Sequence, residues 1–471
     1  MTTRFELADY TAADLIQLYR TKQASPVEVA SAVFARMDRI DGTLNAFALQ
    51  APEVAARAAK LSEDRWLRGV PCGPLDGVPV SIKDLILTQG LPTLRGSHTI
   101  DANQPWDVDA PVTARLREAG AVLIGKTNTP EYGCKGETNS PRFGITRNPW
   151  NPDKTAGGSS GGASAAVSAG MGPIAIGTDG AGSVRIPAAF CGNVGFKPSF
   201  GRVPAYPLSP FGSVAHLGPH TLSVLDTALV MNVLKQPDAR DWTALPFDAR
   251  DYTVGLNDGV RGLRIAYSPT LGYAKNVHLE VAAAVRAAAL AFEEQGAIVE
   301  LVDPGFDDPL DISTGLWFLG AYSVWSGLSA SQQALTDPDF RAQAALGARL
   351  STLDVQQLHQ RRGALGSHMR QFMQQYDLIL TPAVSVPAFD ARPAGVAPMT
   401  AESMLGWTPF SYPFNLTQQP ACSLPCGLTS DGLPIGLQLV GPMFGDALVL
   451  RAARAYESAH PIARANLDLL L

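Results

Sequence analysis

The spacing of apolar and polar residues predicts a helical pattern from residue 11 to residue 70. The segment TAADLIQLY opens with a capping pair, Thr11 and Asp14, and SPVEV places Ser25 as the N-cap of a second helix with proline at its first position. The apolar residues that share one face of this second helix are Val29, Val33, Met37 and Ile40. These helices are therefore expected to pack one face against a core.

Strand-like and helical segments alternate after residue 70. The segment VPVSIKDLI, residues 78–86, contains β-branched residues in a short apolar run and predicts a buried strand that ends near Lys83. A helix is expected at about 111–119, and the segment AVLIG, residues 121–125, predicts another buried strand. This alternation predicts an α/β sheet with helices on its faces.

Glycine, alanine and serine dominate residues 155–185. A helix made of ASAAVSAG, residues 163–170, has little side-chain volume, so other backbones can approach it closely and it is expected deep in the molecule. The strand-like segment GPIAIG, residues 172–177, then leads to Ser183 in the loop GTDGAGSVR.

A linker is expected at about 236–262, after which the alternation resumes. The segment LRIAYS at 263–268, a helix at about 278–295 and the segment AIVELV at 297–302 continue the β/α pattern. Residues 305–350 show no clear periodicity but are rich in aromatic residues, namely Trp317, Phe318, Tyr322 and Trp325.

Composition narrows the class of protein. The chain has 471 residues, of which 46% are hydrophobic, so it can bury a large core. Its 37 basic and 43 acidic residues give a net charge of −6, which disfavours a nucleic-acid partner. Neither an N-terminal apolar segment nor a membrane-length apolar run is evident, so no membrane association is expected.

The cysteines indicate a reducing compartment. They are odd in number, scattered, and lack the spacing of a metal site, so reduced thiols and a cytoplasmic location are expected. The five are Cys72, Cys134, Cys191, Cys422 and Cys426.

Ser183 resembles a reactive serine, but no histidine lies near it in the sequence to accept its proton. Lys83 is the alternative base, because it closes an apolar run where burial would lower its pKa from about 10.4. Two other interpretations of Lys83 stay open: a strand-end lysine that reaches solvent, or one paired with Asp84.

The segment GGSSGG at 157–162 holds two hydroxyls in a flexible glycine frame, although it can also be a simple turn before the small-residue helix. It contains the pattern GxSxG around Ser160, but the preceding residues do not predict the strand that an α/β-hydrolase elbow requires. It also lacks the lysine of a phosphate-binding P-loop.

Five segments together resemble the amidase signature family. They are GVPVSIKD (77–84), GKTNTPEYG (125–133), RNPWNPDKTAGGSSGGASAAVSAG (147–170), GTDGAGSVRIPAAFCGNVGFKPSFGRVP (177–204) and PFNLTQQPACSLPCGLTSDGLPIGLQLVG (413–441). The resemblance implies an α/β fold in which a single large mixed sheet is covered by helices on both faces. It implies one domain over 1–471, with N-terminal helices to 70, a catalytic segment at 71–235, and a completing segment at 263–471 whose part at about 305–350 shapes the substrate pocket.

The resemblance also implies a catalytic triad. Ser183 matches the nucleophile, Ser159 the serine beside an unusual cis peptide bond, and Lys83 the base. The N–H groups of Gly180, Ala181 and Gly182, with that of Ser183, are expected to form the oxyanion hole. Asp179 and Arg185 are expected to brace this loop as an ion pair.

Gly133 and Cys134, in the segment YGCKGETNS, are expected to contact substrate. Neither a metal nor an organic cofactor is implied.

The expected activity is hydrolysis of a carboxylic amide through an acyl-enzyme, on bulky aryl or alkyl amides, with carbamates (urethanes), anilides or esters as further substrates. The aromatic residues of 305–350 can instead belong to the core. One alternative is the glutaminase A subunit of a tRNA-dependent amidotransferase, although GRVPAYPLSPFGSVAHLGPHT (201–221) looks more like independent hydrolases. Another alternative is a non-catalytic binding relative, and a homodimer is expected only by analogy.

Overall fold

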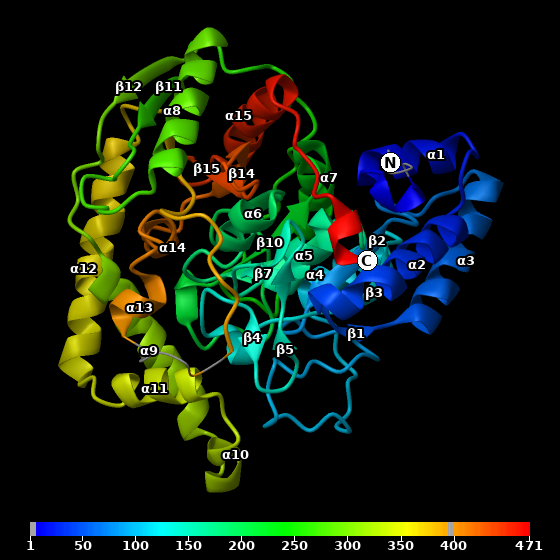
Figure 1. Cartoon of the computed structure of the whole chain (residues 1–471), viewed down its shortest axis with the longest axis horizontal. Helices are drawn as coiled ribbons and strands as arrows, with labels where there is room; N and C mark the ends of the chain where they lie inside the picture. Colours follow the sequence, from blue (N-terminus) through cyan, green and yellow to red (C-terminus); the bar gives the residue numbers. More distant parts are fainter. Residues whose placement is uncertain (1–5, 394, 396–399) are drawn as a thin grey trace.

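A mixed sheet of eleven strands forms the centre of the molecule within residues 6–393, 395 and 400–471, which are the residues that this computed structural model describes (Figure 1). In order across the sheet, the strands are β1 (Phe47–Gln50), β3 (Val122–Thr127), β2 (Pro79–Lys83), β8 (Ile174–Asp179), β10 (His216–Thr221), β9 (Val194–Lys197), β14 (Ala421–Leu428), β15 (Pro434–Val440), β13 (Leu378–Pro382), β11 (Arg264–Tyr267) and β12 (Ile298–Leu301). β2 runs parallel to β3 and β8, β11 runs parallel to β12 and β13, and the other pairs are antiparallel. Two small hairpins lie outside this sheet: β4 (Asn139–Ser140) with β5 (Gly144–Ile145), and β6 (Arg147–Asn148) with β7 (Asn151–Thr155).

Helices cover both faces of the sheet, which confirms the predicted fold class. The α-helices of the described residues are α1 (Ala12–Arg20), α2 (Pro26–Leu44), α3 (Pro52–Arg68), α4 (Pro111–Glu118), α5 (Gly161–Ser168), α6 (Arg185–Cys191), α7 (Val224–Leu234), α8 (Leu279–Glu294), α9 (Leu310–Ser326), α10 (Ala330–Ala334), α11 (Pro338–Gly347), α12 (Thr352–Phe372), α13 (Ala401–Leu405), α14 (Pro413–Leu416) and α15 (Asp446–Ala459). Helices α4, α7, α8 and α15 share one apolar core with the sheet, whereas α2, α3 and α5 share another. The alternation along β3 explains this, because Leu123 joins the first core while Val122 and Ile124 join the second.

The N-terminal helices begin where their capping residues predict. The Thr11 hydroxyl accepts a hydrogen bond from the Asp14 N–H at 3.2 Å, and the Ser25 hydroxyl accepts one from the Glu28 N–H at 3.2 Å. In both cases the acidic side chain returns a hydrogen bond to the cap, which completes a capping box. The predicted elements that end at Lys83, span 111–119, and lie at 263–268, 278–295 and 297–302 are also present.

Residues 11–70 are not helical throughout, which corrects the sequence-based prediction. Asn45 ends α2 in a left-handed conformation, and the next residues form β1, the edge strand that pairs antiparallel with β3. Four residues are too few to display the alternation that identifies a strand, and the pairing partner lies far away in sequence.

The small-residue helix α5 lies deep in the molecule, as predicted. Its residues from Gly161 to Val167 are all buried. A Cβ atom on Gly162 would lie within 2.7 Å of the Asn128 carbonyl oxygen, so the neighbouring chain passes where a side chain would stand. This close packing holds the segment just before α5 against the carboxyl ends of β2 and β8.

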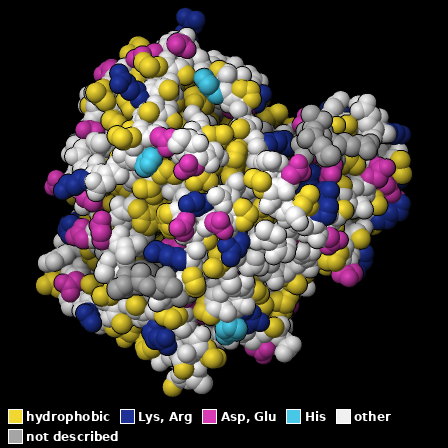
Figure 2. Space-filling model, in the orientation of Figure 1, with side chains coloured by type: hydrophobic (Ala, Val, Ile, Leu, Met, Phe, Trp, Pro, Cys, Tyr) yellow, Lys and Arg dark blue, Asp and Glu magenta, His cyan; other side chains and the backbone are white. Residues whose placement is uncertain are grey.

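The surface carries charges of both signs. Figure 2 shows Lys and Arg side chains interspersed with Asp and Glu over the face turned to the viewer. Among the helices of the described residues, none combines the length and the apolar character that crossing a membrane requires.

Candidate active site

Lys83 is the last residue of β2, and its side chain is fully buried. Its Nζ atom lies 2.7 Å from Ser159 Oγ, and 2.9 Å from both Ser160 Oγ and Thr178 Oγ1. The structure therefore excludes the two other interpretations of Lys83, because the amine neither reaches solvent nor makes an ion pair with Asp84.

Burial governs the protonation of this amine. Removal from water lowers the pKa of Lys83 well below its ordinary 10.5, and the charge of Asp179 opposes that shift only in part. The three oxygens around Nζ belong to uncharged hydroxyls, none of which can neutralise an ammonium group. The site therefore favours a neutral amine that carries one lone pair.

The hydrogen bonds around Ser160 indicate where that lone pair points. The Ser160 hydroxyl donates to the Thr178 carbonyl at 3.1 Å, so its oxygen is left to accept from Lys83. A neutral amine has two N–H donors, and these suit Ser160 and Thr178. The lone pair is then available to the hydroxyl of Ser159.

The predicted glycine frame around Ser159 is present. The peptide bond between Gly158 and Ser159 is cis, which confirms the sequence-based expectation. A Cβ atom on Gly158 would lie 2.6 Å from the Glu137 carbonyl carbon, so only glycine fits there. The Ser160 N–H donates to the Ser183 carbonyl at 3.2 Å, which joins the two serine loops directly.

Ser183 lies in the loop between β8 and α6, where the Asp179 carboxylate organises the backbone. Asp179 accepts hydrogen bonds from the N–H groups of Gly182 at 2.7 Å and Val184 at 3.2 Å. The Ala181 carbonyl accepts one from the Ser411 hydroxyl at 2.7 Å. The loop that presents Ser183 is thus held from both sides.

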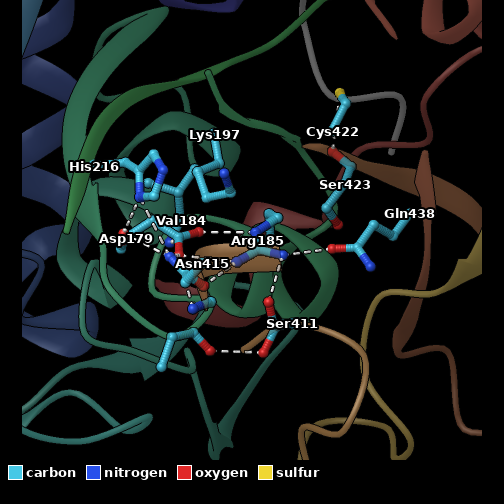
Figure 3. A network of polar contacts seen from close by, with 12 residues as sticks. Asp179, Val184, Arg185, Lys197, His216, Ser411, Asn415, Cys422, Ser423 and Gln438 are labelled. Atoms are coloured by element: carbon cyan, nitrogen blue, oxygen red, sulfur yellow. Dashed lines mark hydrogen bonds and ion pairs between the residues drawn. The ribbon is translucent and has the colours of Figure 1, made fainter. Parts of the chain in front are cut away.

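Arg185 forms the predicted ion pair with Asp179 and extends it into a buried network (Figure 3). Its Nε and Nη2 atoms donate to the two Asp179 oxygens at 2.9 and 3.0 Å. Its remaining donors reach Gln438 Oε1 at 2.7 Å and Asn415 Oδ1 at 2.6 Å. Burial opposes ionisation of Asp179, but the Arg185 charge and hydrogen bonds outweigh it and lower the pKa of this carboxyl below its usual range.

We expect Arg185→Met to lower the free energy of unfolding by about 3–5 kcal/mol, because Asp179 would remain buried without its cation. Denaturant unfolding followed by circular dichroism measures this loss. Arg361→Met is the matched control, since its ion pair with Asp311 is exposed and should be worth less than about 1 kcal/mol. Equal losses in the two variants would contradict a bracing role for Arg185.

The expected oxyanion-hole donors fall into two groups. The Gly182 N–H already donates to Asp179, so this donor serves the loop itself. Among the described residues, the N–H groups of Gly180, Ala181 and Ser183 have no acceptor. Gly180 also needs its bare Cα, because a Cβ atom there would lie 2.6 Å from the Trp317 ring.

A cavity of about 280 Å³ opens beside these groups, and both Ser159 and Ser183 line it. Gly133 also lines it, in a left-handed conformation, and a Cβ atom there would lie 3.3 Å from Ser159 Oγ. Cys134 is buried outside the lining, where its carbonyl accepts a hydrogen bond from the Trp317 indole at 3.1 Å. Cys134 therefore supports the wall instead of contacting the cavity.

Only part of the aromatic region 305–350 reaches the cavity. Trp317, on α9, lines it and stacks on Phe211 with ring centroids 4.0 Å apart. Phe318 belongs to the same apolar cluster as Trp317 but lies outside the cavity lining, and Trp325 packs against another cluster, also outside the lining. Trp317 therefore fits the interpretation as a pocket residue, whereas Phe318 and Trp325 fit the interpretation as core residues.

Sequence reasoning missed several residues of the site. Thr178 contacts Lys83, and the segment 198–213 supplies much of the cavity wall, including Tyr206, Leu208 and Phe211. His216 lines the cavity as well, with Nδ1 2.8 Å from the Val214 carbonyl oxygen and with burial lowering its pKa well below 6.5. The run of prolines and apolar residues in YPLSPF was the available sign that this loop is structured. No cluster of three metal-ligating side chains occurs in the part of the chain that the structure describes.

Comparison with known proteins gives consistent matches across the chain. The family model described as Amidase matches residues 28–450. The chain is 38% identical over 459 residues to the acylamidase of Rhodococcus erythropolis, with 96% of this chain and 95% of the relative covered. It is 35% identical over 460 residues to the A subunit of the glutamyl-tRNA(Gln) amidotransferase of Chloroflexus aggregans, with 92% of this chain and 93% of the relative covered. The crystal structure of a bacterial aryl acylamidase among the amidase signature enzymes matches with a TM-score of 0.89, 32% identity and 96% coverage of each chain.

Proposed function

Because the chain belongs to the amidase signature family, we propose that it hydrolyses carboxylic amides with Ser183 as nucleophile, Ser159 as proton relay and Lys83 as base. The observation that carries this proposal is the buried amine of Lys83, 2.7 Å from Ser159 Oγ at the edge of a cavity that Ser183 also lines. A serine hydroxyl is a weak nucleophile until a base removes its proton. A neutral lysine supplies that base without histidine.

In the first step, Ser183 Oγ attacks the amide carbon while its proton passes to Ser159, whose own proton passes to Lys83. The carbonyl oxygen becomes an oxyanion, which the N–H groups of Gly180, Ala181 and Ser183 suit as donors. Each such donor typically contributes about 100- to 1000-fold in rate. The fixed position of the loop means that these dipoles need not reorganise during the reaction.

In the second step, the C–N bond breaks and the leaving amine takes a proton back from the lysine–serine relay. The acyl group stays on Ser183 as an ester. Water then attacks this ester and gives its proton to the same relay. The ester C–O bond breaks, the relay returns the proton to Ser183 Oγ, and the carboxylic acid leaves. Atoms and charge balance with water as the only co-substrate.

The cavity wall supports bulky aryl or alkyl amides as substrates. Trp317 and Phe211 form a stacked aromatic wall, and Leu208 and Tyr206 extend the apolar lining. Similarity to an acylamidase and an aryl acylamidase supports the same class. Anilides, carbamates (urethanes) and esters present the same acyl carbon and are included in the proposal.

A panel of 4-nitroanilides, alkyl amides, carbamates and esters, offered to wild type and Ser183→Ala together, tests this function. We expect Ser183-dependent turnover, with bulky aryl or alkyl amides preferred over acetamide. Absence of turnover on the whole panel by well-folded wild-type protein would count against it.

The second candidate function is the glutaminase A subunit of a tRNA-dependent amidotransferase, which the Chloroflexus relative supports. This role predicts glutamine hydrolysis that depends on a second protein of the same complex. Wild-type turnover of anilides by the isolated chain, without glutaminase activity, would favour the free-standing amidase.

The proposal includes a cytoplasmic location. All five cysteines are free, which suits a reducing compartment. It also includes a homodimer, which the mass in solution would test.

A further inference from the structure

Arg95 lines the same cavity as Ser183, and its guanidinium has no hydrogen-bond or ion-pair partner among the described residues. The other charged residue of the lining, Asp241, already accepts hydrogen bonds from the N–H groups of Ala205 and Thr243, both at 2.8 Å. Its second bond to Thr243, from the hydroxyl at 2.6 Å, completes that arrangement. A largely apolar cavity thus carries one cation that makes no ion pair with Asp241, the anion of the same wall.

Arg95 has a backbone conformation that residues with a side chain rarely adopt. Its φ of 56° lies in the left-handed region, which favours glycine over residues that carry a side chain. The N–H of Arg95 donates to the Asp84 carbonyl at 3.0 Å, and the Asp84 carboxylate accepts from Leu94 N–H at 2.9 Å. Since Asp84 directly follows Lys83, the loop that carries Arg95 is fixed to the strand that carries the amine.

A second residue with a left-handed backbone conformation lies beside Arg95. Tyr132, with a φ of 52°, also lines the cavity, and its N–H donates to the Arg95 carbonyl at 2.9 Å. Gly133 follows it and packs near Ser159. Two strained residues that are joined by a hydrogen bond and face one cavity are typical of a binding wall.

We infer that Arg95 is a specificity-determining residue that binds a carboxylate of the substrate, so that the preferred substrate is a bulky amide with a carboxylate away from the scissile bond. This inference rests on the proposed function of the same site. A guanidinium offers a planar pair of donors that matches a carboxylate, and such a pair is strengthened where water is partly excluded. The aromatic wall of Trp317 and Phe211 then receives the apolar body of the substrate.

Paired probes test this inference, each with a carboxylate replaced by the isosteric isopropyl group. On the acyl side they are glutaric acid mono-4-nitroanilide and 5-methylhexanoyl 4-nitroanilide. On the amine side they are the N-butyryl derivatives of 4-aminobenzoate and 4-isopropylaniline. The readout is the ratio of kcat/KM for carboxylate over isopropyl within one protein.

For at least one pair we expect this ratio to fall by about 10- to 100-fold in Arg95→Met, the usual range for a hydrogen bond to a charged group. Arg95→Lys should keep part of it, because the charge remains but the planar donors are lost. Arg264→Met is the matched control, since Arg264 lies outside the cavity lining, already pairs with Glu300 at 2.8 Å and should leave the ratio at its wild-type value. A ratio that is the same in wild type and Arg95→Met for both pairs overturns the inference.

Binding separates this inference from the proposed function. Calorimetry on Ser183→Ala measures the affinity for each probe without turnover. If wild type hydrolyses the isopropyl probes but Arg95→Met changes neither the kcat/KM ratio nor the affinity ratio, the inference fails and the amidase proposal stands. If wild type hydrolyses no probe yet the carboxylates bind in an Arg95-dependent way, carboxylate recognition stands and the amidase proposal fails.

Discussion

Replacing Ser183 by alanine should lower amide hydrolysis by about 10⁴- to 10⁶-fold, the scale on which serine hydrolases lose activity when their nucleophile is removed. The expected cause is the loss of the oxygen that would form the acyl-enzyme, while the oxyanion donors and the cavity remain. Initial rates of 4-nitroaniline release, with wild type and variant at equal concentration, measure the effect. A fluorophosphonate probe should label the wild type at residue 183 and leave the variant unlabelled.

Ser213→Ala is the control for this experiment. Ser213 also lines the cavity, but its hydroxyl accepts a 2.8 Å hydrogen bond from Arg362 and lies outside the proposed relay. The hydrolysis rate of Ser213→Ala should stay readily measurable in the same assay. A Ser183→Ala protein that retains a tenth or more of the wild-type rate would exclude Ser183 as the nucleophile.

The elements that the sequence predicted well are those whose signals are local. The capping boxes at Thr11 and Ser25 each lie within four residues, and their helices begin there. The strand ending at Lys83 follows from one short apolar run. The helix α9 gave no such signal, because it is buried on several sides, at residues such as Gly315 and Ala321. Its sequence therefore lacks the alternation of apolar and polar faces that identifies a helix.

The site itself was only partly predictable, because its contacts join distant segments. The resemblance to a family marked Lys83, Ser159 and Ser183, but only the structure brings Thr178 to the amine. The use of the Gly182 N–H by Asp179 likewise depends on how the loop turns, which composition alone does not determine. The cavity wall at 198–213 was missed because its residues are brought to the serines by pairing of β10 with β8.

The buried network of Asp179 and Arg185 links the stability of the protein to the proposed catalysis. Asp179 orders the Ser183 loop through two backbone donors and is itself held ionised by Arg185. Its charge also favours the protonated form of Lys83, although burial of the amine dominates. The carboxylate that orders the loop of the proposed nucleophile therefore opposes the neutral form of the proposed base, and that neutral form depends on the exclusion of water from Lys83.

Lys83→Met should lower turnover at neutral pH by at least about a thousandfold, within the range attributed to a positioned general base. Wild-type kcat/KM should fall as the pH is lowered through the pKa of Lys83, because the protonated amine has no lone pair for Ser159. Ser160→Ala should lose much less, since the Ser160 hydroxyl proton is already donated to the Thr178 carbonyl. A pH–rate profile of wild type and both variants from pH 5 to 10 measures these effects.

The effect of Lys83 on the free energy of unfolding should change with pH in the opposite direction to the effect of a lysine in a salt bridge. The unfolded chain binds a proton at Lys83 below its ordinary pKa of 10.5, whereas burial disfavours that proton in the folded chain. Folding therefore releases a proton, and raising the pH towards 10.5 should stabilise the wild type relative to Lys83→Met. If the wild-type rate stays flat down to pH 5, or the stability difference between the two proteins does not change with pH, Lys83 is not a neutral base.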